Sequence, residues 1–293
     1  MTKEYGKIIF VNSYKGGAGK TTLSMMHCID DLFNTQKYNN VIYMDLDILG
    51  TGTCYLFDET KLPEGKSFEV TGEAVPIELT KGAESALLHV VYLSPSIDGK
   101  FSLGSIHFIN HQELAIEMLR EKIQQYIVKY LNIQPGSLFV LDCSPGFSKF
   151  EQQLLRFCYA ELNTKAEIFE EYITTLDSSH IKKCICCLNA TQTAFEVYAN
   201  HRNIRLTIND MQNYDGYLRS IAGTSNPMPV IDRKWSEIRK EIRDKLNNDD
   251  IELYRWKYSK EIALRTTFLN ESKIENQVED YIFTADNYKE MQA

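Results

Sequence analysis

The sequence predicts an α/β fold in which a doubly wound, mostly parallel sheet is flanked by helices. Three observations predict it. Short apolar runs alternate with helical patterns along all 293 residues, a glycine- and lysine-rich segment joins the first run to the first helix, and two later runs end in aspartate. One sheet accommodates every predicted strand, so we expect a single domain over residues 1–293, with a surface excursion around residues 58–83 that holds short β pieces.

The first unit is a strand, a glycine-rich loop and a helix. Residues 8–11 form an apolar run typical of a buried strand, and residues 21–33 carry apolar side chains near helical spacing. Between them, residues 15–22 read KGGAGKTT, which fits the phosphate-loop pattern G-x-x-x-x-G-K-[ST] with Tyr14 in place of the first glycine. A chance glycine-rich turn is disfavoured because the strand and the helix stand on either side of the loop.

This loop predicts a phosphate-binding site. Without Cβ atoms its backbone N–H groups can converge on a phosphate chain, and the following helix N-terminus adds partial positive charge. Lys20 would contact the β- and γ-phosphates, and the Thr21 hydroxyl would ligate Mg²⁺. The remaining predicted contacts come from Gly16, Gly17, Ala18, Gly19 and Thr22.

The second predicted strand ends in two aspartates. Residues 41–47 are a buried run that holds Asp45 and Asp47, two carboxylates on the same side of the strand. Such a pair is costly unless a cation or a polarised water lies beside it. The alternative is a solvated turn acid. It applies more readily to Asp45, as a brace for the loop, than to Asp47, which lies nearer the strand end.

A third acid ends the run at residues 138–142. Asp142 follows four apolar residues, as expected of a strand that supports Mg²⁺ through water while Thr21 ligates it directly. The turn at Pro145 and Gly146 could respond to a γ-phosphate.

Together these motifs resemble the ParA/MinD family of deviant Walker A ATPases. The resemblance rests on residues 15–22, on 45–52 (DLDILGTG) and on 142–146 (DCSPG). It implies ATP and Mg²⁺ as ligands, slow hydrolysis, and a nucleotide-sandwich homodimer in which Lys15 enters the partner's site. It also implies that Asp47 positions the attacking water.

Two segments bear on the adenine and on the cellular role. Residues 205–210 resemble the family's strand and asparagine that recognise adenine, with Asn209 at the matching position. The proline expected after the last strand is replaced by Trp256-Lys257-Tyr258. Ile48-Leu49 stand where plasmid-partition members have Pro-Gln, which argues against a direct plasmid role.

The other predicted elements complete the alternation of strands and helices. They are strands at 87–93, 184–188, 205–208 and 251–256, and helices at 112–131, 152–176 (possibly in two pieces), 236–246 and 274–282.

Composition narrows the function classes. A net charge of −8 argues against a protein that coats itself in nucleic acid, although a local basic face is not excluded. We expect a cytoplasmic protein with reduced thiols, because the N-terminus is polar and the seven cysteines form no regular framework. No membrane association is expected, since no apolar run is long enough to span a bilayer and the C-terminal end lacks a lysine-rich amphipathic helix.

Two further groups have a plain and a functional interpretation. Cys184, Cys186 and Cys187 contain a C-x-x-C pair, but within a predicted central strand they are more typical of buried core residues than of metal ligands. Residues 233–245 are rich in cations that could contact DNA, yet interleaved acids are typical of a solvated helix.

The leading hypothesis is a Mg²⁺–ATP-dependent switch that dimerises with ATP, engages a protein partner and possible non-specific DNA, and serves DNA segregation or intracellular positioning. The alternatives are an accessory subunit of a larger protein machine and a metal or iron–sulfur carrier.

Overall fold

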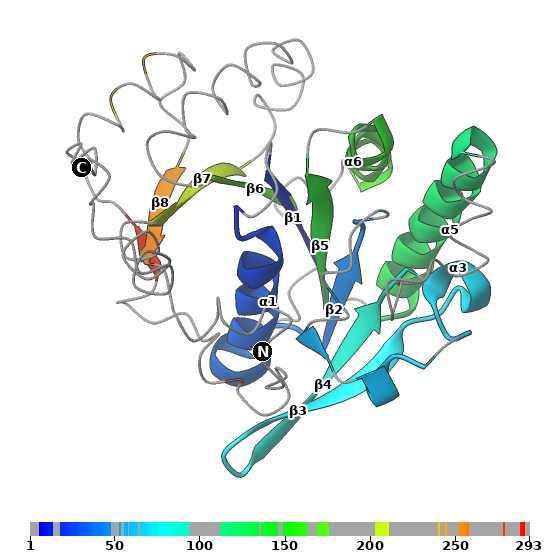
Figure 1. The fold of residues 1–293 in the computed structure, drawn as a ribbon, viewed down its shortest axis with the longest axis horizontal. Coiled ribbons are helices and arrows are strands. Elements are labelled where there is room, and N and C mark those ends of the chain that lie inside the picture. The colour runs from blue at the N-terminus through cyan, green and yellow to red at the C-terminus, as the bar shows by residue number, and fades with distance from the viewer. Residues whose placement is uncertain are drawn as a thin grey trace, which may run out of the picture.

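The structure, a computed structural model, contains one large sheet (Figure 1). It describes residues 6–13, 18–47, 53, 56–57, 59–63, 65–93, 112–134, 136–145, 149–162, 169–175, 203–210, 240, 244, 252–257, 278 and 288–290. The strands are β1 Lys7–Ser13, β2 Asn40–Asp45, β3 Val75–Lys81, β4 Glu84–Val91, β5 Ser137–Pro145, β6 Phe169–Thr175, β7 Asn203–Asp210, β8 Glu252–Lys257 and β9 Tyr288–Glu290. The α-helices are α1 Lys20–Asp30, α3 Phe68–Thr71, α5 Gln112–Ile133 and α6 Lys149–Leu162. Two short turns of other helix types are η1 Asp31–Thr35 and η2 Glu59–Lys61.

The strand order confirms the predicted doubly wound sheet. It runs β3-β4-β2-β5-β1-β6-β7-β8-β9, with β1 in the middle between β5 and β6. All neighbours from β4 to β8 pair in parallel, whereas β3 and β9 pair antiparallel at the two edges. The carboxyl ends of β1, β2 and β5 therefore lie along the same edge of the sheet.

Both faces of the central strands are buried. On β1, Ile9 and Val11 pack on the face covered by α1, while Ile8 and Phe10 pack on the face covered by α5 and α6. Figure 1 shows α1 on one side of the sheet and α5 and α6 on the other. Alternate side chains thus enter two separate cores, which explains why these strands are continuous apolar runs.

The segment predicted as a surface excursion contributes to the sheet and to the cores. β3 lies within it and forms the edge strand beside β4. Its alternation is regular, since Ile77 and Leu79 are buried while Glu78 and Thr80 are exposed. Phe68 of α3 is also buried, in the core under α5.

The helix predicted over residues 152–176 is wrong in its second half. α6 ends at Leu162, and residues 169–175 instead form β6, which pairs with β1 in the centre of the sheet. This stretch ends in Tyr172-Ile173-Thr174-Thr175. Such β-branched and aromatic residues favour a strand wherever a neighbouring strand is open for pairing. The predicted strand at 184–188 lies outside the described residues.

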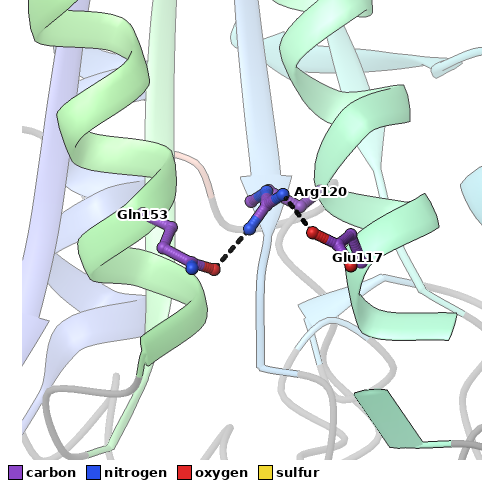
Figure 2. Close-up of polar contacts among 3 residues, drawn as sticks. All are labelled: Glu117, Arg120 and Gln153. Atoms are coloured by element: carbon purple, nitrogen blue, oxygen red, sulfur yellow. Dashed lines mark hydrogen bonds and ion pairs between the residues drawn. The ribbon is translucent and has the colours of Figure 1, made fainter. Parts of the chain in front are cut away.

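A polar contact joins α5 to α6. The Arg120 guanidinium donates to the side chain of Gln153 on α6, and its other terminal nitrogen lies 2.9 Å from Glu117 on its own helix (Figure 2). The Arg120 side chain is 16% exposed, so its bond to Gln153 is partly shielded from solvent, whereas the Glu117 side chain is 57% exposed. It holds α6, which directly follows β5, against the longest described helix.

The other predicted elements have mixed outcomes. The strand predicted at 205–208 is confirmed within β7, and the helix predicted at 112–131 within α5. The strand predicted at 251–256 is confirmed from residue 252 onward, as β8, while residue 251 lies outside the described residues. Of the predicted helices at 236–246 and 274–282, the structure describes only Lys240 and Asp244, both helical, and Val278. No helix in the described ranges has the length and apolar character needed to cross a membrane.

Candidate functional site at the carboxyl edge of the sheet

The C-terminal half of the phosphate loop leads directly into α1. Gly19 caps the helix with φ at 87°, a left-handed conformation that favours glycine, and its carbonyl accepts from Leu23 N at 2.9 Å. Lys20 is the first residue of α1 and is buried, with 7% of its surface exposed. Ala18 and Thr22 are buried beside it, whereas Lys15, Gly16 and Gly17 lie outside the described residues.

Asp142 on β5 faces this helix start. It is 2% exposed, and its Oδ2 accepts a hydrogen bond of 2.9 Å from the Tyr43 hydroxyl on β2. Its Oδ1 is buried without a hydrogen-bond partner. Burial raises the pKa of Asp142 to about 6, while the Lys20 charge and the hydroxyls of Thr21 and Tyr43 act in the opposite direction.

Asp45 is the last residue of β2 and holds the following loop. Its Oδ1 accepts from Asp47 N at 3.0 Å, and its Oδ2 accepts from Thr53 N at 3.1 Å and from the Thr53 hydroxyl. Burial raises the pKa of Asp45 to about 7, and the Asp142 charge adds to that shift. Asp45 therefore braces residues that follow the strand, as the alternative had it, but it is buried rather than solvated.

Asp47 lies beyond the strand that was predicted to include it. β2 ends at Asp45. The Asp45 carboxylate accepts a hydrogen bond from the Asp47 amide two residues further on, a contact typical of aspartate in turns. Asp47 is partly exposed, and its charge raises the pKa of Asp142, so the two carboxylates share one environment. Asp47 is therefore the acid of this edge that solvent can reach, whereas Asp45 and Asp142 are buried.

A further buried acid supports the end of β5. Glu151, in the first turn of α6, accepts from Ser144 N at 3.0 Å and from the Ser144 hydroxyl. Glu151 is 2% exposed, and burial raises its pKa against the opposing effect of the Ser144 hydrogen bonds. The contact ties the residues just after Asp142 to the start of α6.

Two further groups of predicted site residues remain, of which the structure describes only Asn209. Asn209 is the next-to-last residue of β7, where it pairs with Trp256 of β8, so it stands at the carboxyl end of its strand. Cys184, Cys186 and Cys187 lie outside the described residues. Among the residues that are described, no group of three or more His, Cys, Asp or Glu is placed to hold a metal ion.

The cluster suits Mg²⁺ held with phosphates better than a metal held by protein alone. Mg²⁺ usually keeps several waters and takes one or two carboxylates together with phosphate oxygens. Asp142 supplies a buried carboxylate oxygen that lacks a donor, and the Thr21 hydroxyl and Lys20 ammonium act on the same carboxylate. The residues present therefore fit a magnesium–nucleotide site.

Sequence reasoning missed Tyr43 and Glu151. Tyr43 lies two residues before Asp45 on an apolar strand, so the spacing placed its hydroxyl on the face of the acids, but a buried tyrosine is usually read as packing. Glu151 looked like an ordinary acid near a helix start. Their contacts become visible only in the structure, where Tyr43 of β2 bonds Asp142 of β5 and Glu151 of α6 bonds Ser144 of β5.

Comparison with solved structures identifies the fold. Neither a protein-family model nor a curated protein sequence matches the chain. pNOB8 ParA bound to nonspecific DNA aligns with a TM-score of 0.51 at 13% identity, over 98% of this chain and 89% of that one. An ATP complex of McdA from Cyanothece aligns with a TM-score of 0.50 at 10% identity, over 94% and 88%. MinD from Aquifex aeolicus aligns with a TM-score of 0.42 at 14% identity, over 89% and 85%. The alignments with ParA and McdA show that the chain shares their fold.

Proposed function

We propose that the protein is a Mg²⁺–ATP-dependent molecular switch that dimerises with ATP and hydrolyses it slowly. The observation that carries the proposal is the convergence of Gly19, Lys20 and Thr21 with the buried carboxylate of Asp142 at one edge of the sheet. A buried ammonium, a helix N-terminus and a carboxylate oxygen without a donor together suit a phosphate chain and its metal.

The loop and helix start would bind the phosphates. In this proposal Lys20 contacts the β- and γ-phosphates, and Thr21 with Asp142 holds Mg²⁺, which when bound neutralises charge on the phosphate oxygens. Backbone amides complete the cradle, contributed by Gly16, Gly17, Ala18, Gly19 and Thr22.

Two residues would act on hydrolysis. Asp47 orients the attacking water, a role that suits a partly exposed acid at the open side of the edge. Lys15 enters the facing site of a second copy and neutralises phosphate charge there.

Asn209, near the carboxyl end of β7, would recognise the base, because its side chain offers a donor and an acceptor to the adenine edge.

The dimer gives the switch its output. Contacts to ATP that exist only between two copies shift the monomer–dimer equilibrium, and hydrolysis removes them. We infer use in DNA segregation or intracellular positioning in the cytoplasm, together with a protein that reads the ATP state. The solved ParA bound to nonspecific DNA supports DNA as a ligand to test.

The decisive experiment measures assembly and turnover together. Asp47→Ala protein, which should retain ATP, is followed by light scattering with Mg²⁺–ATP, with Mg²⁺–ADP and with ATP in EDTA. A dimer that forms only with Mg²⁺–ATP, together with slow phosphate release by the native chain, supports the switch. A monomer under all three conditions contradicts it.

DNA binding is tested separately by gel shift. The DNA role predicts ATP-dependent binding that weakens steeply with salt, because each phosphate contact releases counterions. Neutral substitutions at Arg239, Lys240 and Arg243 should reduce it, while changes at the exposed Lys61 of η2 should not. ATP-driven dimers that bind no DNA at low salt would point to an accessory subunit of a protein machine instead.

A further inference from the structure

Tyr43 is buried inside the sheet although its side chain ends in a hydroxyl. It lies on β2 with none of its surface exposed, in the core between the sheet and α1. Its register partner on β5 is Val140, and Asp142 follows two residues later on the same face. The tyrosine therefore reaches along the sheet towards the carboxyl edge, where its hydroxyl donates to Asp142 Oδ2 at 2.9 Å.

This hydrogen bond distinguishes the two oxygens of one carboxylate. Oδ2 is bonded to the phenol, whereas Oδ1 is buried with no donor. Lys20 and Thr21, at the start of α1, act on the same carboxylate. A carboxylate held through one oxygen cannot rotate freely, so the other oxygen keeps a constant direction.

We propose that Tyr43 is a positioning residue that holds Asp142 through Oδ2 and so keeps Oδ1 available to the hydration shell of Mg²⁺. This inference rests on the proposed function, because it assigns a role at the same site. The tyrosine itself touches neither nucleotide nor metal in this proposal. Its effect on the metal passes through Asp142, and its hydroxyl also has a hydrogen-bond contact with the Thr53 side chain.

The alternative is that Tyr43 only fills the core. One substitution distinguishes this packing role from the positioning role. Tyr43→Phe keeps the ring and its packing but removes the phenol donor, so Oδ2 loses the bond to β2 and the carboxylate can turn more freely. Loss of such a supporting hydrogen bond typically weakens metal binding by about 10- to 100-fold. A purely packing role predicts no selective change in metal binding.

The test compares ADP binding by calorimetry in EDTA and across a Mg²⁺ titration, so that no turnover is involved. For Tyr43→Phe we expect nearly native ADP affinity in EDTA and a Mg²⁺ midpoint raised by about 10-fold or more. Mn²⁺ binding to the ADP complex, followed by electron paramagnetic resonance, should weaken in parallel. Asp142→Asn should combine with Tyr43→Phe without further loss, since the tyrosine acts through that acid.

Tyr92→Phe is the matched control. Tyr92 is a second buried tyrosine near the same edge, and its hydroxyl donates to the Pro63 carbonyl at 2.7 Å rather than to an acid. This variant should lose stability without any change in the Mg²⁺ midpoint. An equal change in both variants, or equal losses with and without Mg²⁺, would make Tyr43 a packing residue and overturn the proposal.

The remaining outcomes are separable. A native Mg²⁺ midpoint in Tyr43→Phe also overturns the proposal while leaving the nucleotide site intact. Absence of ADP binding by the native chain would overturn the proposed function and this inference together. If Tyr43→Phe alone does not fold, the double variant is compared with Asp142→Asn, where equal midpoints support the coupling and unequal midpoints overturn it.

Discussion

Asp45 and Asp142 are directly paired residues of the parallel strands β2 and β5. Both carboxylates are buried, and the charge of Asp142 raises the pKa of Asp45 further than burial does alone. Each acid is held by different donors, Asp45 by the loop that ends at Thr53 and Asp142 by Tyr43. One edge of the sheet therefore brings together two buried carboxyl groups, and their burial and mutual repulsion favour a protonated Asp45.

This pairing predicts a stability that depends on pH in metal-free protein. The pKa of Asp45 rises on folding from 3.8 to about 7, so the folded chain keeps a proton that the unfolded chain releases. The resulting stabilisation is complete below pH 3.8 and is lost as the pH rises through about 7. Urea unfolding in EDTA should show a free energy of unfolding that falls across this window.

Asp45→Asn should make that fall shallower, because asparagine binds no proton while it can still accept from Thr53 N. Glu121→Gln, which removes an exposed acid on α5, serves as the control and should leave the slope unchanged. Equal slopes in Asp45→Asn and the native chain would show that Asp45 does not retain its proton in the folded state.

Lys20→Ala should reduce ATP affinity by about 100-fold, since a hydrogen bond to a charged group is worth about 3 kcal/mol at most and Lys20 is the buried cation of the site. Calorimetry with Mg²⁺–ATP measures the loss. Lys61→Ala, on the exposed turn η2, is the control for a change in net charge. Native affinity in Lys20→Ala would remove the phosphate-loop assignment.

The trans role of Lys15 predicts complementation between two inactive variants. Lys15→Ala and Asp47→Ala should each turn over ATP slowly. A mixed dimer has one site with native Asp47 that receives Lys15 from the other copy, so mixing should restore part of the activity. If mixed dimers form by light scattering yet turnover stays at the level of the separate variants, Lys15 does not act across the interface.

The contact between α5 and α6 predicts a modest stability loss on substitution. Arg120→Met keeps the aliphatic stem but removes the donor to Gln153, which should lower the free energy of unfolding by about 1 kcal/mol. The control is Lys129→Met, because the Lys129–Glu73 ion pair at 3.6 Å is well exposed and should contribute little. Urea denaturation of both variants distinguishes a shielded contact from a surface pair.

Much of the fold could be predicted because its signals are local. The apolar run of β1, the glycine at position 19 and the lysine after it specify a strand, a helix cap and a cation within a few residues of one another. The two acids at strand ends were visible for the same reason. Their order along the chain was enough to place them at one edge of a parallel sheet.

What escaped prediction depends on partners distant in sequence. The end of β2 is set by the bonds from Asp45 to Asp47 and Thr53, and no periodicity encodes a contact to Thr53. Residues 169–175 form β6 because their β-branched and aromatic residues can pair with β1, and that pairing cannot be read from the local sequence alone. Tyr43 gained its candidate role only through the register that brings it near Asp142.

The central place of β1 between β5 and β6 also governs when the site can exist during synthesis. The phosphate loop leaves the ribosome before the neighbouring strands, so its own strand has no partner until residues 137–145 and then 169–175 have emerged. Pairing over such long separations costs loop-closure entropy and slows folding. The nascent chain must therefore hold this loop on an unpaired strand until those residues have been made, and the candidate site can form only after that point.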